Sequence, residues 1–300
     1  MDLYKIIKNS KIGKIEKDVN IKNITTYRVG GKAKYVVSPK NVDKLIELIK
    51  ILNEEHIKYM IIGNGSNLVF SDDIYDGVLI DLEEFKDLKI NGTVLTVGAG
   101  YSLIALAIKV SNMGLTGMEF ATGIPGTVGG AVYMNAGAYK SDMGYIVSEI
   151  KVLTPDLKIK KIYNKDLDFH YRTSFLQKNK GYICLEATIV LKLGNKEVIK
   201  DLIEERRKRR YMTQPLNFPS AGSVFRNPED DYAGRLIEEC NLKGYKLGGA
   251  MVSEKHANFI VNFKNATGKD VHDLILFVKD KVKEKHGIEL KIEQEFVNWE

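Results

Sequence analysis

Residues 121–138 read ATGIPGTVGGAVYMNAGA, and this stretch places the strongest constraint on what the chain folds around. Five of its eighteen residues are glycine and none is charged. Glycine has no side chain to bury and loses more conformational freedom on folding than other residues, so the stretch is a poor core element. Bare backbone can instead lie against a flat or phosphorylated ligand, with its N–H groups directed at it. The stretch therefore predicts a site for a large nucleotide cofactor.

A second glycine-bearing loop, IIGNGSN at 61–67, continues the apolar stretch IKYMIIG at 57–63. It matches only part of the dinucleotide fingerprint G-x-G-x-x-G, and no helix clearly follows it, so a standard Rossmann site is not expected. Glycines are also common in ordinary turns. Its position upstream of residues 121–138 still favours a large nucleotide ligand.

Length and composition describe an ordinary globular protein. The 300 residues suit two or three domains, with 44% hydrophobic and 28% charged residues. The net charge of +6 favours anionic small molecules and is modest for a dedicated nucleic-acid-binding protein. Neither a signal peptide nor a stretch of about 18 apolar residues is visible, so we expect a cytoplasmic protein without a membrane span.

The sequence gives little support for a metal site or a disulfide. Cys184 lies in the apolar run YICLEATIVL and is predicted to be a buried, inert thiol, and Cys240 is too far along the chain to suggest a disulfide. Both fit a reducing cytoplasm. His256, in SEKHANF, is predicted to have a structural role. No histidine pair has metal-ligand spacing, so we predict no metal site; the five are His56, His170, His256, His272 and His286.

The periodicity of apolar residues suggests three segments, 1–85, 86–196 and 197–300. In the first two we expect helices at 41–53 and 102–113, the latter capped by Ser102, and strands at 33–37, 57–63, 77–81, 93–100, 146–153, 158–163 and 182–193. In the third we expect helices at 197–211, 231–240 and 268–286, and strands at 258–263 and 287–299. Thr267 and Asp270 are a predicted capping box for the last helix, which Gly287 ends.

The helix at 197–211 has two interpretations. Its apolar face is predicted to be Val198, Ile199, Leu202 and Ile203, and it ends in EERRKRRY. The basic end can simply be a solvated turn that complements the helix dipole. Alternatively, one or two of its arginines contact a diphosphate; the candidates are Arg206, Arg207, Arg209 and Arg210.

Three further segments carry candidate reactive groups. Arg172, in FHYRTSF, is either a surface residue or a planar clamp for a carboxylate. Ser223, in PSAGSVFRNP, is either a turn residue or a proton donor on a rigid loop, and Asn227 nearby can donate to an anionic oxygen. The acids of GIELKIEQEFVNW are, on pattern alone, a solvent-exposed face; they are Glu289, Glu293 and Glu295.

Taken in order, these motifs resemble one family. NITTYRVGGKA, IIGNGSNLVFSD, GAGYSL, GLTGMEFATGIPGTVGGAVYMNAGAY, YRTSF, QPLNFPSAGSVFRNP, GGAMVSEKHANFIVN and GIELKIEQE span roughly residues 20–295. The chain is similar to the UDP-N-acetylenolpyruvoylglucosamine reductases (UDP-N-acetylmuramate dehydrogenases) of bacterial cell-wall synthesis, in their shorter subclass. The resemblance implies an α+β protein: a two-part FAD-binding domain of the vanillyl-alcohol-oxidase (PCMH) type, at 1–85 and 86–196, and a smaller α+β substrate domain at 197–300 with a C-terminal catalytic strand.

The resemblance also assigns site residues. It implies that Arg172, Ser223 and Glu293 are catalytic. The last match departs from the family pattern, because Gln294 and Asn298 stand where an aliphatic residue and a glycine are usual, and Glu295 is the alternative acid. The implied substrate residues are Arg172, Asn227 and Arg210. The implied cofactor residues are Tyr27, Ile62, Gly63, Asn64, Gly65, Ser66, Asn67, Gly98, Ala99, Gly100, Thr122, Gly123, Ile124, Pro125, Gly126, Gly129, Gly130, Asn135 and Gly137.

The implied reaction uses noncovalently bound FAD and NADPH as co-substrate. NADPH reduces the flavin, and the hydride then passes to the enolpyruvyl methylene carbon of the UDP-sugar. By this resemblance Arg172 stabilises the charge that develops on the carboxylate, Glu293 orients or polarises the site, and Ser223 delivers the proton. We expect a monomer that acts on small molecules, with no nucleic acid and no membrane as partner.

Two other functions are compatible with parts of the sequence. A flavin oxidase of the same fold often tethers FAD through a histidine in the first loop, but Asn64, Ser66 and Asn67 offer none. A nucleic-acid-binding module built on RRKRR would need a long basic stripe, whereas Glu204 and Glu205 flank this run directly.

Overall fold

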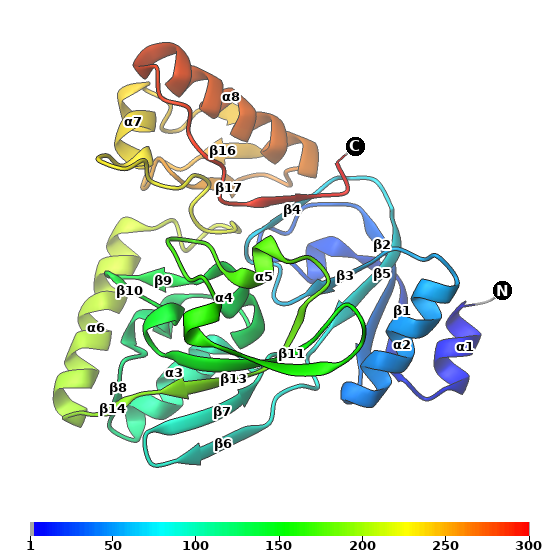
Figure 1. Ribbon diagram of the computed structural model, residues 1–300. Helices are drawn as coiled ribbons and strands as arrows, with labels where there is room; N and C mark the ends of the chain where they lie inside the picture. The colour runs from blue at the N-terminus through cyan, green and yellow to red at the C-terminus, as the bar shows by residue number, and fades with distance from the viewer. Residues whose placement is uncertain (1–2, 300) are drawn as a thin grey trace. The chain divides into compact units, whose positions relative to one another are not determined.

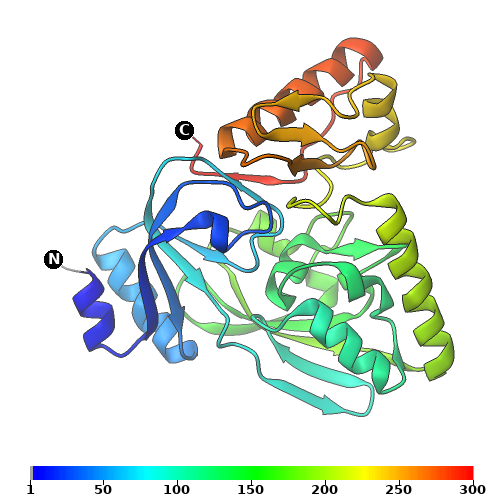
Figure 2. The same ribbon diagram turned by 180° about the vertical axis from the view of Figure 1, so that it is seen from behind.

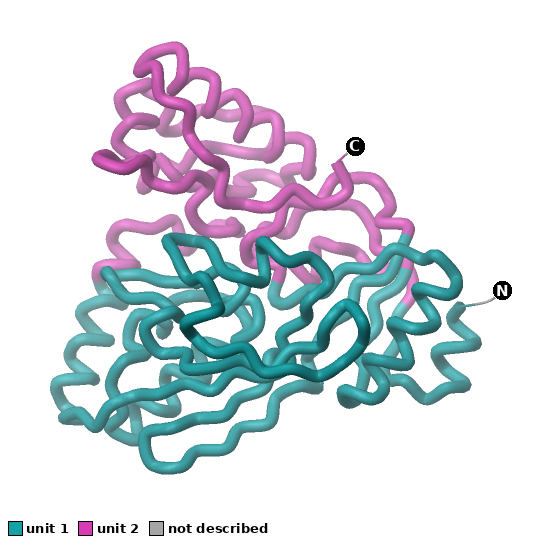
Figure 3. The backbone as a smooth tube through the Cα atoms, viewed as in Figure 1, with its two compact units in different colours: residues 1–16, 35–64, 77–208 teal, residues 17–34, 65–76, 209–300 magenta. Residues whose placement is uncertain are grey.

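The computed structural model describes residues 3–299 and groups the chain into two compact units (Figure 3). Unit 1 contains residues 1–16, 35–64 and 77–208, and unit 2 contains residues 17–34, 65–76 and 209–300. Each unit therefore gathers segments that are distant in sequence. The sequence analysis instead predicted three consecutive domains, with boundaries after residues 85 and 196. That division remains a prediction about functional domains.

The first sheet has four strands in the order β1 (Gly13–Asn20), β2 (Lys32–Pro39), β5 (Tyr75–Asp81) and β3 (Tyr59–Ile62), as Figure 1 shows. The predicted helix at 41–53 is confirmed as α2 (Val42–Glu54). The Asn41 side chain caps it by accepting a hydrogen bond from the Lys44 amide at 3.0 Å. Its apolar face is buried; it consists of Leu45, Leu48, Ile49 and Leu52.

The second sheet is antiparallel throughout, in the order β12 (Ile159–Tyr163), β11 (Val147–Leu153), β13 (Ile183–Val190), β7 (Val94–Gly98) and β6 (Leu88–Asn91). Figure 2 shows the β6–β7 hairpin at its edge. The strands predicted at 146–153 and 158–163 are confirmed. The one at 182–193 divides into β13 and β14 (Lys192–Leu193), because β14 leaves this sheet to pair with β8 (Leu115–Thr116). Cys184 is buried in β13, which raises its pKa to about 12, as an inert thiol requires.

Shorter elements complete unit 1. The helix predicted at 102–113 is α3 (Leu103–Asn112), capped by Ser102 through the Ala105 amide at 3.3 Å. Sequence analysis did not predict α1 (Leu3–Asn9), which buries only two residues. The remaining elements are β9 (Gly137–Ala138), β10 (Ser141–Asp142), α5 (Phe175–Lys178) and the 3₁₀ turns η1 (Ile21–Asn23, in unit 2), η3 (Met143–Tyr145) and η4 (Asn164–Asp166).

The glycine-rich stretch 121–138 is not the continuous bare ribbon that the sequence suggested. It begins at the end of the 3₁₀ turn η2 (Glu119–Gly123) and continues into the helix α4 (Val128–Met134). Thr127 caps this helix through the Gly130 amide at 3.3 Å. Val128, Ala131 and Val132 are buried because their i, i+3, i+4 spacing places them on one face. Residues 124–127 therefore lie between the two helical elements as the irregular part of the stretch.

The helix predicted at 197–211 is α6 (Lys196–Thr213), but its predicted apolar face is wrong. Among Val198, Ile199, Leu202 and Ile203, Ile199 alone is buried, and the side chain of Val198 is 64% exposed. Ile199 packs closely on Gly194, whose added Cβ would lie 3.0 Å from Ile199 Cδ1. The helix thus buries a single residue rather than a stripe.

Unit 2 contains a three-stranded sheet in the order β15 (Lys246–Leu247), β16 (Ala250–Val252) and β17 (Ile260–Asn262), with α8 (Gly268–His286) packed against it. The predicted capping box of Thr267 and Asp270 is present, and Gly287 ends α8 with a left-handed φ of +67°. The helix predicted at 231–240 is α7 (Ala233–Glu239). Of the strand predicted at 287–299, only β18 (Glu295–Val297) forms, parallel to β4 (Leu68–Phe70).

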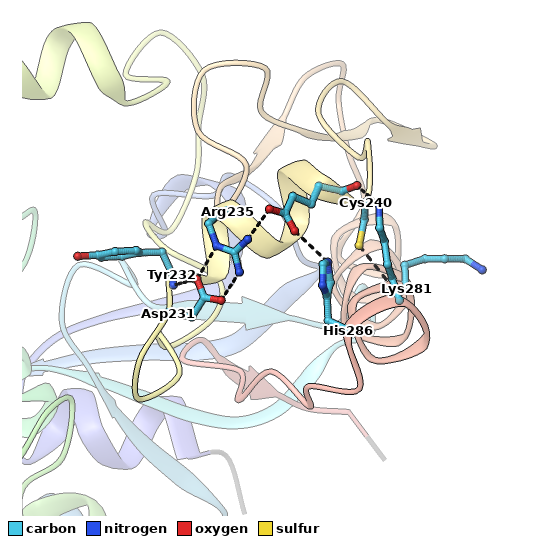
Figure 4. A network of polar contacts seen from close by, with 8 residues as sticks. Asp231, Tyr232, Arg235, Cys240, Lys281 and His286 are labelled. Atoms are coloured by element: carbon cyan, nitrogen blue, oxygen red, sulfur yellow. Dashed lines mark hydrogen bonds and ion pairs between the residues drawn. The ribbon is translucent and has the colours of Figure 1, made fainter.

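A polar network joins α7 to the C-terminal end of α8 (Figure 4). Arg235 donates to Asp231 from Nε at 2.7 Å and also pairs with Glu239, whose carboxylate lies 3.8 Å from His286 Nε2. Arg235 lowers the pKa of Asp231 to about 2. Cys240 is a free thiol that lies 3.6 Å from the Lys281 carbonyl. Arg235 and Glu239 are about half exposed, so solvent screens their ion pair. None of the helices in residues 3–299 has the length and apolar character needed to cross a bilayer.

Asp81 ends β5 beside Ile62, at the carboxyl ends of two parallel strands. Burial, together with the nearby Glu83, raises its pKa from 3.8 to about 6. The charged form of Asp81 therefore costs folding free energy that the protonated form does not.

We expect Asp81→Asn to stabilise the protein at pH 7.5 by about 1–2 kcal/mol and to have little effect at about pH 3. The wild-type carboxyl is protonated in both states below its unfolded pKa, and the folded state loses stability as pH rises through about 6. Urea unfolding at the two pH values measures the difference. Asp76→Asn on the same strand, where Asp76 forms an exposed ion pair with Lys34, is the control. An equal effect of Asp81→Asn at both pH values would contradict this explanation.

Candidate functional site

Three loops of unit 1 meet at Thr127. A Cβ added to Gly63 would lie 2.7 Å from Thr127 Oγ1, so the loop after β3 contacts the start of α4 without room for a side chain. Ser102 and Thr127 form an antiparallel bridge, and the Gly129 amide donates to the Ala99 carbonyl at 2.8 Å. The structure therefore brings the glycine at 63, the turn at 98–102 and the stretch 122–130 into one contiguous surface of backbone.

Part of this surface has unused hydrogen-bond donors. Within residues 3–299, the backbone N–H groups of Gly126 and Thr127 have no acceptor, although the Gly126 carbonyl accepts from Leu103 at 3.0 Å. Both residues are half-buried, and Gly130, one turn into α4, is exposed. Adjacent backbone N–H groups without an acceptor can bind a phosphate or another anion.

Several predicted cofactor glycines are needed for the packing of the chain itself. A Cβ at Gly98 would lie 2.2 Å from the Phe85 carbonyl oxygen, and one at Gly100 would lie 1.9 Å from that of Leu82. Gly129 and Gly137 are similarly close to Ala99 and Asp142. Sequence reasoning treated all of these glycines as facing a ligand, because a ligand and a neighbouring backbone exclude a side chain in the same way.

Arg172 lies on a strained loop that is held at several points. Its φ is +55°, a left-handed value that is unusual for a residue with a side chain, and its Nη2 donates to the Gly137 carbonyl at 2.8 Å. The Arg172 carbonyl accepts from Gln177 Nε2 at 3.2 Å, and the same Nε2 donates to the Tyr133 carbonyl at 2.9 Å. Ser174 Oγ also donates to Tyr133, at 2.7 Å. Gln177 and Ser174, which sequence reasoning missed, thus tie the Arg172 loop to the end of α4.

Asn135 supports the same loop. It is 1% exposed and caps α4 in a left-handed conformation, with φ of +43°. Its Nδ2 donates to the His170 carbonyl at 2.8 Å, and its Oδ1 accepts from the Gly144 amide at 2.9 Å. Since both ends of the carboxamide are bonded within the protein, the contribution of this side chain to a cofactor site is indirect.

Four of the predicted cofactor residues belong to unit 2, namely Tyr27, Gly65, Ser66 and Asn67. Gly65 has a left-handed φ of +56° and would place a Cβ 2.7 Å from Thr25 Cγ2, so no other residue fits there. Asn67 donates from Nδ2 to the Glu293 carbonyl at 3.1 Å, and its own carbonyl accepts from the Glu295 amide at 2.9 Å. Tyr27 is fully buried in the core of unit 2, so its role is in packing that part of the chain.

Ser223 follows a left-handed turn at Gly222, whose φ is +74°. The chain after it is fixed by Asn258, whose carbonyl accepts from the Val224 amide at 2.9 Å and whose carboxamide forms two hydrogen bonds with the backbone of Phe225. His256 Nδ1 accepts from the Asn258 amide at 3.2 Å, and burial lowers the pKa of His256. The predicted structural role of His256 is therefore confirmed, and the motif SEKHANF was the signal for the missed Asn258.

Glu293 lies on the segment next to the Ser223 loop. Its amide donates to the Val224 carbonyl at 2.8 Å, and Phe225 and Ile292 form an antiparallel bridge. Glu295 is instead part of β18, where it pairs with Leu68. The geometry thus favours Glu293 over Glu295 as the acid close to Ser223. The unusual Asn298 has a left-handed φ of +64°, which asparagine tolerates better than most residues, so the absence of glycine there is explained.

The predicted substrate residues outside these loops are placed less specifically. Asn227 Oδ1 accepts from the Ala233 amide at 3.1 Å, at the start of α7, so that oxygen has a structural role. Arg210 is half-buried in the last turn of α6. Among the other arginines of this helix, Arg206 stacks on the Tyr139 ring at 4.7 Å and Arg207 pairs with Glu204 at 3.8 Å.

Within residues 3–299, no group of His, Cys, Asp and Glu is arranged to hold a metal ion.

Comparison with known proteins adds a family to this geometry. Residues 33–163 match the FAD binding domain, and residues 214–297 match the UDP-N-acetylenolpyruvoylglucosamine reductase C-terminal domain. The FAD-binding fold predicted from the sequence is thereby confirmed. The chain is 46% identical to the UDP-N-acetylenolpyruvoylglucosamine reductase of Anoxybacillus flavithermus over 289 residues, covering 96% of each chain. It is 44% identical to that of Bacillus subtilis over 292 residues, covering 97% of this chain and 96% of the relative.

A solved structure supports the same family. The UDP-N-acetylenolpyruvylglucosamine reductase from Thermus caldophilus superimposes with a TM-score of 0.81 at 34% identity, covering 94% of this chain and 98% of that one. The agreement extends over both parts of the chain, from the loops around Thr127 to the segments that carry Ser223 and Glu293. The chain belongs to the UDP-N-acetylenolpyruvoylglucosamine reductase family.

Proposed function

We propose that this protein uses FAD and NADPH to reduce the enolpyruvyl group of UDP-N-acetylenolpyruvoylglucosamine, forming UDP-N-acetylmuramate for peptidoglycan synthesis. The observation that carries the proposal is the contact of Gly63 with Thr127, which joins the glycine-rich loops within a chain that matches this family over nearly its whole length. We further propose that the enzyme works in the cytoplasm as a monomer.

The backbone of unit 1 fits a dinucleotide such as FAD. The free N–H groups of Gly126 and Thr127 can bind a diphosphate, and Gly63 and Gly130 add no side chain that would block its approach. The turn at 98–100 shapes the neighbouring backbone. When bound, FAD supplies the hydride chemistry, accepting a hydride from NADPH and passing one to the substrate.

Arg172 stabilises negative charge on the substrate. Hydride addition to the enolpyruvyl methylene carbon moves charge onto the conjugated carboxylate, and a positioned guanidinium stabilises that charge more in the transition state than in the ground state. The hydrogen bonds from Gln177 and to Gly137 hold the loop and the guanidinium before the substrate binds. Preorganisation of this kind avoids a cost at the moment of reaction.

Ser223 provides the proton that the carbon next to the carboxylate then needs. A serine hydroxyl is a weak acid, so it donates only to a strongly basic enol-type intermediate, and the rigid turn after Gly222 keeps it in place. Glu293, on the adjacent segment, orients or polarises the group that receives the proton. Asn227 and Arg210 remain candidates for contact with the UDP diphosphate.

Ser223→Ala should separate the two half-reactions. Reduction of the bound flavin by NADPH should proceed at the wild-type rate, whereas reoxidation by UDP-N-acetylenolpyruvoylglucosamine should slow by about 10²–10⁴-fold because the proton donor is lost. Stopped-flow absorbance measures both steps. Ser220→Ala, in the same loop, is the matched control. If overall turnover of Ser223→Ala stays within a few-fold of wild type, Ser223 is not the proton donor.

Gly63→Ala should weaken FAD binding by about 10-fold or more, because its Cβ would lie 2.7 Å from Thr127 Oγ1 and push the loops apart. Adding Thr127→Ala removes that oxygen, so the double variant should bind FAD more tightly than Gly63→Ala alone. Fluorescence titration of the apoprotein with FAD measures this. Gly92→Ala is the control, because Gly92 has no atoms within 4 Å and its φ of +59° makes the substitution a strain on stability alone. Equal affinity in Gly63→Ala and wild type would show that the loop contact does not shape the cofactor site.

Gln177→Met should release the Arg172 loop. Without the hydrogen bonds to the Arg172 and Tyr133 carbonyls, amide exchange in residues 170–174 should rise about 10-fold, and reoxidation by the enolpyruvyl sugar should slow more than reduction by NADPH. Hydrogen exchange followed by mass spectrometry, with Lys180→Met as an exposed control, tests this. Unchanged amide exchange in residues 170–174 would show that Gln177 does not hold the Arg172 loop.

A further inference from the structure

The side chain of Gln294 connects the two predicted reactive segments of unit 2. Gln294 directly follows Glu293 and is 4% exposed. Its Nε2 donates to the Ala221 carbonyl at 3.2 Å and to the Gly222 carbonyl at 3.4 Å. These two residues immediately precede Ser223, so the Gln294 carboxamide holds the turn that leads into Ser223. Gln294 itself lies on the segment that carries Glu293.

Two buried polar atoms at this carboxamide lack a hydrogen-bond partner within the described residues. The Tyr27 hydroxyl is fully buried beside the Gln294 side chain, and burial raises the pKa of Tyr27. Neither Tyr27 Oη nor Gln294 Oε1 has a hydrogen bond within residues 3–299. Buried polar groups without partners are rare in proteins, and each needs an explanation.

The orientation of the carboxamide indicates how these atoms are used. Because Nε2 faces two carbonyl oxygens, the opposite orientation would place Oε1 against them and is excluded by charge. Oε1 is therefore an acceptor directed away from the loop, and the neighbouring Tyr27 hydroxyl is a donor.

We propose that Tyr27 and Gln294 are positioning residues for Ser223: the Tyr27 hydroxyl donates to Gln294 Oε1, which fixes the carboxamide so that Nε2 holds the Ala221 and Gly222 carbonyls. The inference rests on the proposed function, in which Ser223 delivers a proton. Gly222 has a left-handed φ of +74°, and the direction of Ser223 depends on how firmly that turn is held. The pair also explains the polar residue at 294, where the family pattern has an aliphatic one.

The test compares Tyr27→Phe, Gln294→Met and the double variant as FAD-loaded enzymes. We expect reoxidation by UDP-N-acetylenolpyruvoylglucosamine to slow about 10-fold in Gln294→Met and about 3-fold in Tyr27→Phe. Because Tyr27 acts through Gln294, the double variant should be no slower than Gln294→Met. Flavin reduction by NADPH and the KM for the sugar should be unchanged in Gln294→Met. Because Tyr27 is itself a predicted cofactor residue, Tyr27→Phe and the double variant are judged by the ratio of the reoxidation rate to the flavin-reduction rate. Tyr75→Phe, another buried tyrosine of unit 2, controls for loss of a buried hydroxyl.

Several results would overturn the inference. Slowing that multiplies in the double variant would show that the two residues act separately, and equal slowing of both half-reactions would indicate a general loss of structure. If Gln294→Met does not fold, the test depends on Tyr27→Phe, which removes a single oxygen atom. Unchanged reoxidation of the flavin in Tyr27→Phe would then refute the positioning role of Tyr27 and Gln294. A wild-type enzyme that the sugar does not reoxidise would instead refute the proposed function, and the inference with it.

Discussion

The approach of Gly63 to Thr127 is the contact on which the candidate cofactor site depends. No side chain fits at residue 63, since its Cβ would lie 2.7 Å from the Thr127 hydroxyl. Thr127 in turn caps α4 and bridges Ser102, so a single residue connects the ends of β3 and β7 with the start of a helix. The free N–H groups of Gly126 and Thr127 are a consequence of this junction, because the backbone there is used for neither helix nor sheet.

The predicted reactive segments of unit 2 are organised by polar side chains rather than by glycines. Asn258 forms hydrogen bonds to the backbone around Phe225, Asn67 holds the Glu293 carbonyl, and Gln294 holds the turn before Ser223. Asn258 bonds a backbone donor and a backbone acceptor at once, whereas Asn67 and Gln294 donate to backbone carbonyls. In each case the carboxamide fixes the direction of the chain. Asn135 and Gln177 do the same for Arg172 in unit 1.

Local signals in the sequence were sufficient for much of the fold. Ser102 and the Thr267–Asp270 box mark helix starts that the structure confirms, and runs rich in Ile, Val and Leu identified the long strands. These features depend on neighbours along the chain. The family motifs likewise identified the fold, since Arg172, Ser223 and Glu293 are recognisable by the residues around them.

What the sequence did not reveal depends on contacts between distant segments. Gly98 and Gly100 resemble ligand-facing glycines, but their carbonyl neighbours at Leu82 and Phe85 become apparent only in three dimensions. The helix α4 was hidden because its glycines obscured the spacing of Val128, Ala131 and Val132. Val198 was assigned to a buried face because periodicity cannot tell how much of a helix another element covers.

Anaerobic absorbance spectroscopy of the purified protein tests the central claim most directly. If the loops around Thr127 hold FAD for reduction of the enolpyruvyl sugar, the protein will show flavin bands that NADPH bleaches and UDP-N-acetylenolpyruvoylglucosamine restores. A colourless protein that does not take up added FAD, or a reduced flavin that the sugar leaves bleached, would contradict the account.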